Sequence, residues 1–143
     1  MQIRYAAESD IKRLAGCDKH IAKAELAHAV TLCRIYVAEE NGSFAGWLRY
    51  NLFWDNTPFL NLLYLLPQFR GKGFGRQLLS FWEREMAAQG FDTLMTSTQS
   101  DEYAQHFYVK CGYEAVGGFR LPGDPYEVFF AKCLQMKTGA EHG

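Results

Sequence analysis

The sequence lacks an excess of charge of either sign. Its 143 residues carry 15 lysines and arginines against 16 aspartates and glutamates, which gives a formal net charge of −1. A protein that binds nucleic acid or an anionic membrane through its overall field carries a clear positive excess. We therefore expect neither a nucleic acid nor a membrane as a partner.

Long apolar runs and an apolar leader are also missing. The longest apolar stretch, near residues 59–66, is interrupted by Asn61 and is much shorter than the ~20 residues that cross a bilayer. The opening segment, MQIRYAAESDIKRLAG, has no apolar region of the kind that a secretory signal contains. These absences predict a cytoplasmic protein.

Cysteine and histidine are few and have no metal-binding spacing. The four cysteines are Cys17, Cys33, Cys111 and Cys133, and no two of them form a C-x-x-C pair. The four histidines are equally scattered. Because structural zinc sites use these residues at short spacings, the sequence predicts no metal centre. We expect each cysteine to be a small buried apolar residue of a reducing compartment.

What the sequence does contain is apolar bulk within the length of one domain. A chain of 143 residues fits a single domain of ordinary size. Apolar residues make up 48% of it, with 11 Phe, 8 Tyr and 3 Trp, which is enough for a packed core without disulfides. We expect the folded domain to span residues 1–136 and a flexible tail to follow at 137–143.

The apolar pattern alternates between strand and helix periods along the chain. Strands are predicted at residues 3–6, 34–39, 44–53, 59–66, 93–98, 113–119 and 126–134, with a hairpin turn at Asn41-Gly42. Four helices are predicted. The first follows Ser9 or Asp10, either of which could cap it, and the second covers residues 21–32. The third runs from residue 74 to Gly90, and the fourth runs from a cap at Ser100 or Asp101 to Gly112.

This order of elements predicts an α/β (α+β) fold with a mixed sheet of about seven strands and helices on both faces. The stretch 59–66 is nearly all apolar, which favours a central strand that is buried on both faces. The strand–helix–strand unit that passes through Gly71 must cross over right-handed, so its two strands are expected to run parallel.

A glycine-rich turn lies between the apolar strand and the next helix. It reads Gln68-Phe69-Arg70-Gly71-Lys72-Gly73-Phe74-Gly75-Arg76. The free N–H groups and the dipole at a helix N-terminus attract anions, and glycines let a phosphate approach the backbone closely. With three basic side chains in the same place, the turn suits a polyanion that carries several phosphates.

Other phosphate-binding motifs fit this segment less well. The sequence has no G-x-x-x-x-G-K-[ST] run, so it contains no Walker P-loop. A dinucleotide fingerprint, G-x-G-x-x-G/A, is met by Gly71 and Gly73 but has Arg76 at its third position. A plain tight turn with solvated basic side chains is the remaining structural interpretation.

Two segments together resemble the GCN5-related N-acetyltransferase (GNAT) superfamily. Gln68, Gly71 and Gly73 satisfy its signature Q/R-x-x-G-x-G/A, and a second match, F-Y-x-x-x-G-Y/F, follows about 35 residues later at residues 107–113. The strand order resembles that of the family over nearly the whole chain. The resemblance implies a single-domain GNAT fold and an acetyl-CoA-dependent N-acetyltransferase, an acyltransferase in which a primary amine attacks directly in a ternary complex, without a metal.

The resemblance also implies a role for each matching position. The backbone of Leu65 would contact the pantetheine arm or the thioester carbonyl, where two parallel strands splay apart. Tyr108 would protonate the departing CoA thiolate, because a phenol with a pKa of about 10 is a usable acid toward a thiolate of pKa about 8.5. A core tyrosine on the helix face with Phe107 is the other interpretation of Tyr108. The N–H groups from about Arg70 to Arg76 would hold the pyrophosphate. The cofactor-binding residues of this segment would be Gln68, Arg70, Gly71, Lys72, Gly73, Phe74, Gly75 and Arg76.

The sequence departs from the family pattern at two positions. Asp101 stands where many members have an asparagine that contacts the cofactor, so it is either a cofactor contact or only a helix cap. Asn61 stands where many members have a glutamate that deprotonates the amine. Glu39, Asp55 and Glu127 are the possible substitutes, and each could also be a solvated surface acid.

The acceptor amine is not identified by the sequence. Aromatic residues that could line its pocket, or belong to the core, are Trp47, Tyr50, Phe53, Trp54 and Phe119. A non-catalytic acetyl-CoA-binding or regulatory module is the alternative of a different class. An enzyme that uses a longer acyl-CoA or a hydroxyl acceptor is the alternative within the same class. A monomer and a homodimer both agree with the sequence.

Overall fold

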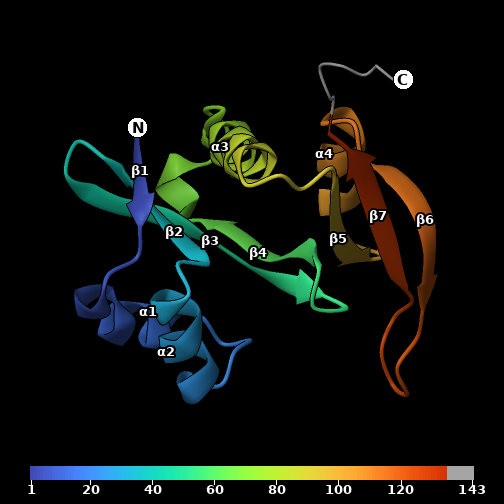
Figure 1. The fold of residues 1–143 in the computed structure, drawn as a ribbon, viewed down its shortest axis with the longest axis horizontal. Coiled ribbons are helices and arrows are strands. Elements are labelled where there is room, and N and C mark those ends of the chain that lie inside the picture. The colour runs from blue at the N-terminus through green and yellow to red at the C-terminus, as the bar shows by residue number, and fades with distance from the viewer. Residues whose placement is uncertain (135–143) are drawn as a thin grey trace. The chain divides into compact units, whose positions relative to one another are not determined.

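Seven strands form one mixed sheet within residues 1–134, the part of the chain that the computed structural model describes (Figure 1). The strand order is β1-β2-β3-β4-β5-β7-β6, and the predicted fold class is confirmed. The chain divides into two compact units, Met1–Asn51 with Leu62–Phe81 and Leu52–Asn61 with the residues from Trp82 onward. The tail predicted at 137–143 lies outside the described residues.

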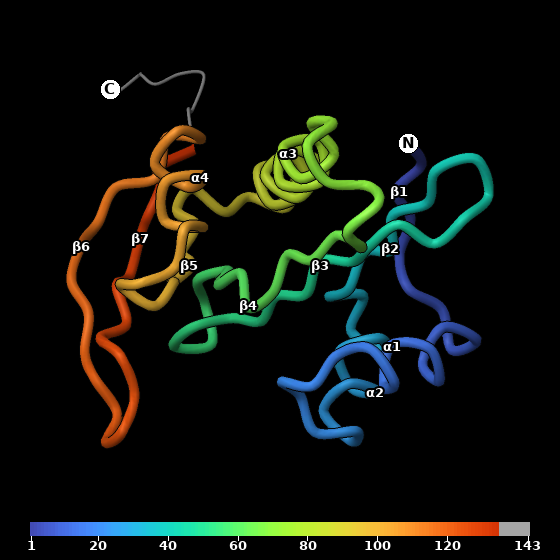
Figure 2. The backbone as a smooth tube through the Cα atoms, turned by 180° about the vertical axis from the view of Figure 1, so that it is seen from behind, coloured from blue at the N-terminus to red at the C-terminus, as the bar shows by residue number. Residues whose placement is uncertain are grey.

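The first unit begins with an antiparallel arrangement in which β2 lies between β1 and β3, visible from behind in Figure 2. Its elements are β1 (Gln2–Tyr5), α1 (Ile11–Cys17), α2 (Lys23–Thr31), β2 (Ile35–Glu40), most of β3 (Ser43–Phe53), the end of β4 (Thr57–Leu65) and the start of α3 (Phe74–Ala88). Asn41 and Gly42 have φ of 53° and 79°. Because a type I′ hairpin turn needs positive φ at both central residues, the predicted hairpin is confirmed.

Strand β2 supplies the core of this unit on both of its faces. Ile35 and Val37 are fully buried in a cluster that includes Leu14 of α1. Tyr36 points to the opposite face, as the period of a strand requires, and packs edge-on against Phe81 of α3 with ring centroids 5.2 Å apart. Each such side chain contributes roughly 1.5–3 kcal/mol when fully buried. Helices therefore pack against both faces of β2.

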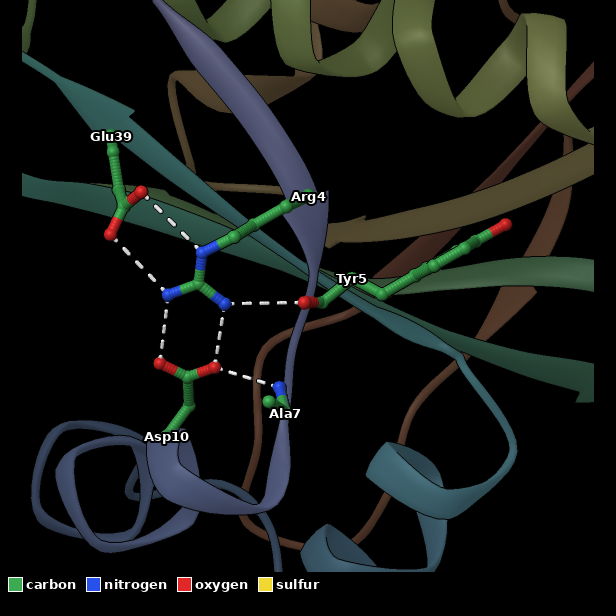
Figure 3. Close-up of polar contacts among 5 residues, drawn as sticks. All are labelled: Arg4, Tyr5, Ala7, Asp10 and Glu39. Atoms are coloured by element: carbon green, nitrogen blue, oxygen red, sulfur yellow. Dashed lines mark hydrogen bonds and ion pairs between the residues drawn. The ribbon is translucent and has the colours of Figure 1, made fainter.

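An ion-pair cluster ties β1 to the turn before α1 (Figure 3). The two terminal nitrogens of Arg4 donate to the carboxylate of Asp10 at 2.8 and 3.0 Å, and Arg4 Nε donates to Glu39 at 3.4 Å. Asp10 Oδ2 also accepts the N–H of Ala7 at 2.7 Å. Asp10 precedes α1 but makes no capping bond into it. Asp10 therefore has the N-cap position that the sequence predicts, but its side chain does not cap the helix, because its carboxylate binds Arg4 and Ala7, which precede it.

We expect this cluster to contribute stability that is lost in acid. The hydrogen bonds from Arg4 lower the pKa of Asp10, and they outweigh burial, which acts in the opposite direction. A carboxylate with a folded-state pKa below its unfolded value stabilises the protein fully above about pH 4 and loses that contribution as pH falls through the folded-state pKa. Urea unfolding between about pH 6 and pH 2 should show a larger loss for the native chain than for Asp10→Asn. Parallel curves would contradict this expectation.

The second unit is built around β7. Its elements are the rest of β4 and α3, β5 (Thr93–Gln99), α4 (Ala104–Lys110), β6 (Glu114–Phe119) and β7 (Glu127–Cys133). Strands β4 and β5 run parallel, with Phe59 opposite Met95 and Leu60 opposite Thr96, so the predicted parallel unit is confirmed. Strand β7 pairs antiparallel with β5 on one side and with β6 on the other. The last strand within residues 1–134 therefore lies inside the sheet, and β6 lies at its edge.

Strand β4 is central in the sheet but is not buried on both faces. It has the middle place in the strand order, whereas Asn61 and Tyr64 are exposed. A central place secures hydrogen-bonding neighbours for the backbone, but it does not secure a helix over each face. The expectation of burial on both faces is therefore wrong.

The cysteines also differ from the expectation of four buried apolar residues. All are free thiols, and only Cys111 is buried. Cys17 is the last residue of α1, and Cys133 is the last residue of β7. Cys33 has a positive φ of 59° in the turn between α2 and β2. All three lie where an element ends, and they are exposed there.

Candidate active site

The glycine-rich segment joins β4 to α3 in the first unit. It begins with a 3-10 turn at Pro67–Phe69, and Gly71 and Gly73 then take φ of 75° and 84°. Residues with a side chain rarely adopt this conformation, so glycine is required at both positions. The carbonyl of Gly73 accepts the N–H of Gln77 at 3.1 Å, which starts the hydrogen bonding of α3. The N–H groups just before Gln77 are those that a helix cannot satisfy internally.

The basic side chains of this segment are exposed. Arg70 turns back toward the strand, where its Nε donates to the carbonyl of Leu65 at 2.8 Å and its guanidinium lies 5.1 Å from the ring centroid of Tyr64. The backbone carbonyl of Leu65, which is predicted to contact the donor, thus already accepts a hydrogen bond from Arg70. The predicted phosphate-binding residues that are exposed are Gln68, Arg70, Gly71, Lys72, Gly73 and Arg76, whereas Phe74 and Gly75 are half-buried.

A close approach of β3 to β4 fixes the strand that leads into this segment. A Cβ atom at Gly46 would collide with the carbonyl oxygen of Tyr64 and would lie 2.9 Å from Cδ2 of Leu65. The N–H of Leu66 donates to the carbonyl of Ala45 at 2.8 Å. Gly46 is therefore needed for the two strands to meet at Leu65. The role of Gly46 is not evident from the sequence, because a glycine within a strand pattern does not reveal which backbone approaches it.

Tyr108 lies on α4 in the second unit and is only 7% exposed. Its hydroxyl is hydrogen-bonded to Thr96 of β5, and the Thr96 hydroxyl donates its own proton to the carbonyl of Leu60 at 3.0 Å. Burial raises the pKa of Tyr108 above its ordinary value near 10, against the opposing effect of Thr96. The phenol is thus protonated at neutral pH, and it is a weaker acid than the sequence alone indicates.

Asp101 lies exposed in the turn between β5 and α4. Helix α4 begins at Ala104 and has no side-chain cap, so the prediction that Ser100 or Asp101 caps it is wrong. The turn is closed instead by Glu102, whose Oε1 accepts the N–H of Gln99 at 2.8 Å. The role of Asp101 toward a cofactor stays a prediction.

The three carboxylates considered as bases have different surroundings. Glu39 pairs with Arg4, and Asp55 is exposed in the turn before β4 with a φ of 63°. Glu127, on β7, is half-buried, and its Oε2 accepts the hydroxyl of Ser97 at 2.6 Å. Of these three, Glu127 lines a pocket of the second unit.

A pocket of about 350 Å³ in the first unit contains a buried carboxylate. The side chain of Asp18 is fully buried and accepts hydrogen bonds from Arg49 Nε at 2.9 Å, from Trp47 Nε1 at 3.2 Å and from the His20 N–H at 3.1 Å. Burial alone would raise the pKa of Asp18, but the hydrogen bonds outweigh it and lower the pKa. The pocket is lined by Cys17, Asp18, Lys19, His20, Trp47, Leu62, Tyr64 and Leu66.

A pocket of about 270 Å³ lies within the second unit. It is lined by Phe59, Ser97, Phe119, Leu121, Asp124, Pro125, Glu127 and Phe129. Of the aromatic residues that the sequence singled out, Phe119 lines this pocket and Trp47 lines that of the first unit. Tyr50 is buried and Trp54 is 79% exposed. Phe53 packs against Phe129 with ring centroids 6.4 Å apart.

Two kinds of feature are not found in the described part of the chain. Within residues 1–134, no three side chains of the metal-binding types come together in one place. Over the same residues, no helix combines the length and the apolar character that crossing a bilayer requires.

Comparisons with known proteins agree with this architecture. The structure of the ribosomal-protein-S18-alanine N-acetyltransferase from Escherichia coli is similar with a TM-score of 0.81 and 17% identity over 99% of both chains. The structure of the ribosomal-protein-alanine N-acetyltransferase from Brucella melitensis is similar with a TM-score of 0.77 and 21% identity, over 94% of this chain and 100% of the other. The structure of the PaiA N-acetyltransferase from Thermoplasma acidophilum in complex with coenzyme A is similar with a TM-score of 0.74 and 17% identity, over 92% of this chain and 98% of the other.

The sequence itself identifies the family. No curated protein is similar enough in sequence to count as a relative. The model of the acetyltransferase (GNAT) family matches residues 5–113, which is well over half of the chain and includes the glycine-rich segment and Tyr108. The chain therefore belongs to the GNAT family of acetyltransferases.

Proposed function

We propose that the protein transfers the acetyl group of acetyl-CoA to a primary amine. The observation that carries this proposal is the segment before α3. Two glycines in it require positive φ, three basic side chains are exposed around them, and the N-terminal N–H groups of a 15-residue helix follow. Membership of the GNAT family supports acyl transfer, and the similar structure with coenzyme A bound supports the identity of the donor.

The segment Gln68–Arg76 is proposed to bind the pyrophosphate of the donor. Backbone N–H groups near Gly71, Gly73 and Gly75 would donate to the phosphate oxygens, and the positive end of the α3 dipole would add to the attraction. The exposed Lys72 and Arg76 would add charge at the same place. Leu65 would contact the pantetheine arm or thioester through its backbone.

The chemistry needs an orientated thioester and a neutral amine. The nitrogen lone pair attacks the carbonyl carbon, the C–S bond breaks, and the thiolate leaves with its electron pair. Tyr108 is proposed to give that thiolate its proton. Because the pKa of the buried Tyr108 is raised, transfer of its proton to the thiolate is uphill. The phenol therefore acts as the C–S bond breaks, and the proton that the nitrogen loses restores it. The Thr96 hydroxyl, beside the phenol, can then turn from the Leu60 carbonyl and donate to the phenolate that remains.

We expect acetyl-CoA to raise the melting temperature of the protein. A ligand that binds only the native state adds ~2.7 kcal/mol to the free energy of unfolding at a 100-fold excess over Kd, which is a shift of several degrees for a domain of this size.

Gly73→Val should weaken binding of acetyl-CoA at least ~10-fold, because valine is strained at that φ and blocks the approach of phosphate. The measurement is calorimetric titration of acetyl-CoA, with NAD and ATP for comparison.

Gly90→Val is the matched control, since Gly90 closes the other end of α3 with a φ of 95° and, like Gly73, has open space where a Cβ would be. It should lower stability and leave acetyl-CoA affinity unchanged. A melting shift with NAD or ATP but none with acetyl-CoA would contradict the proposed donor. Equal affinity in native and Gly73→Val protein would mean that the phosphates bind elsewhere.

Activity itself is tested by thiol release from acetyl-CoA in the presence of amines, amino acids, polyamines, aminoglycosides and peptides. Release with at least one amine is expected. Tight binding of acetyl-CoA with no release for any of them would favour a non-catalytic binding module. Release only with a hydroxyl acceptor or a longer acyl-CoA would favour the other acyl transfer reactions.

A further inference from the structure

The pocket of the second unit combines an aromatic wall with carboxylates. The ring centroid of Phe129 lies 5.7 Å from that of Phe59 and 5.3 Å from that of Phe119. Glu127 and Asp124 supply negative charge, and within the described part of the chain no basic side chain lines the pocket. Aromatic faces and carboxylates both attract cations, so the pocket suits a small molecule with a positive charge and an apolar body. Its volume of about 270 Å³ is at the small end for ligand sites.

The carboxylate of Glu127 is held in place from one side. Ser97 donates to Oε2 of Glu127 at 2.6 Å, and the pairing of β5 with β7, with Ser97 opposite Phe129, brings the two side chains together. No hydrogen bond to Oε1 of Glu127 is formed within residues 1–134. Glu127 is half-buried, so a ligand in the pocket can reach an oriented carboxylate that still has an acceptor to offer.

The pocket is adjacent to the residues that hold Tyr108. Leu60 and Thr96 are paired in the parallel strands β4 and β5, and the Thr96 hydroxyl donates to the Leu60 carbonyl beside the phenol. The pocket residues Phe59 and Ser97 are their immediate neighbours in the sequence. Because consecutive side chains of a strand point to opposite faces, Ser97 and Thr96 serve the pocket and the phenol from opposite faces of β5. The carboxylate of Glu127 and the phenol of Tyr108 are thus hydrogen-bonded to consecutive residues of β5, Ser97 and Thr96.

We infer that this pocket is the acceptor site and that it takes a primary ammonium carried on a small aromatic or alkyl group. Glu127 binds the ammonium and receives its first proton. This inference rests on the proposed function for the acyl donor, and it adds the class of acceptor and the base.

In the proposed reaction the ammonium loses two protons and the departing sulfur gains one. The ammonium gives one proton to Glu127, which passes it to water, and the freed lone pair forms the N–C bond. As the C–S bond breaks, sulfur keeps its electron pair and takes a proton from Tyr108, and the second proton of the nitrogen restores the Tyr108 phenol. The products are one amide, one free thiol and one proton released.

The first test measures binding to the full chain without acetyl-CoA, by NMR titration of three probes. 2-Phenylethylamine has the charge and the apolar body, phenylacetate has the apolar body with the opposite charge, and ethanolamine has the charge on a polar body. We expect 2-phenylethylamine to bind at least ~10-fold more tightly than either of the others. Equal binding of phenylacetate or of ethanolamine would overturn the inference, and this test needs no variant to fold.

The second test uses Glu127→Gln, which keeps the size of the side chain and removes its charge. In thiol release with 2-phenylethylamine, KM should rise and kcat should fall, for a combined loss of about 100-fold or more in kcat/KM. The affinity for acetyl-CoA should not change. Glu114→Gln is the matched control, because Glu114 is exposed on the neighbouring strand and does not line the pocket.

The outcomes separate this inference from the proposed function. No affinity of the native chain for acetyl-CoA would overturn the proposed donor, and the ranking of the three probes would still decide the pocket. Thiol release with native kinetics in Glu127→Gln would overturn the inference and leave the donor intact. A faster reaction with a peptide N-terminal amine than with 2-phenylethylamine would also overturn it, since the acceptor would then be a polypeptide.

Discussion

Replacing Tyr108 by phenylalanine is expected to lower kcat about 100-fold or more and to leave the affinity for acetyl-CoA nearly unchanged. The hydroxyl acts only as the C–S bond breaks, so its loss affects the transition state and not the binding of the donor. The ring remains, and with it the edge-on contacts of Tyr108 with Phe107 and Tyr113 at centroid distances of 5.2 and 5.7 Å. Thr96 keeps its hydrogen bond to Leu60.

Tyr113→Phe is the matched control for this prediction. Tyr113 is a second buried tyrosine of the same unit, and its hydroxyl donates to Glu83 at 2.8 Å in a cluster with Lys132. Its loss should lower stability by about 1 kcal/mol and leave kcat unchanged. The measurements are kcat with a good acceptor, a melting curve and an acetyl-CoA titration. A native kcat in Tyr108→Phe would remove Tyr108 from the mechanism, and the donor assignment would stand because it rests on the glycine-rich segment.

Asp18→Ala is expected to lower the free energy of unfolding by about 3–5 kcal/mol. The substitution leaves the guanidinium of Arg49, whose side chain is only 8% exposed, without its carboxylate partner. It also leaves the indole N–H of Trp47 without its acceptor. Breaking one side of a buried pair costs more than the pair contributes, because a charge is left desolvated.

The double variant Asp18→Leu with Arg49→Met separates these two contributions. Removal of both charges should recover most of the loss, since apolar side chains of similar size often replace a buried pair without cost. Urea unfolding of the three proteins gives the comparison. A loss below about 1 kcal/mol for Asp18→Ala would mean that water reaches the pair and screens it.

Features that depend on neighbouring residues were predictable from the sequence. Asn41-Gly42 specifies a hairpin because few other residue pairs accept positive φ twice. Gly90 ends α3 for a similar reason. The glycine-rich segment was recognisable because positive φ at Gly71 and Gly73 leaves a direct trace in the sequence as glycine.

Features that depend on strand register or tertiary packing were not predictable. Asp18 and Arg49 are 31 positions apart, and Ser97 and Glu127 are 30 positions apart. Each pair meets only after the sheet and its helices are in place, and no local pattern marks either partner. The start of α4 was placed too early for a related reason. Glu102 accepts the N–H of Gln99 in the turn, and the cap predicted at Asp101 is not formed.

The place of β7 between β5 and β6 has a consequence for how the protein folds during synthesis. A ribosome releases β5, α4 and β6 before β7, yet β7 is the strand to which both β5 and β6 are hydrogen-bonded. The hairpin of β2 and β3 can close within a few residues of its turn, whereas β5 and β6 must wait with exposed backbone edges that other chains can join. A premature stop before Glu127 would therefore leave β6 without a partner and one edge of β5 unpaired. Such a short truncation would make the chain prone to aggregation.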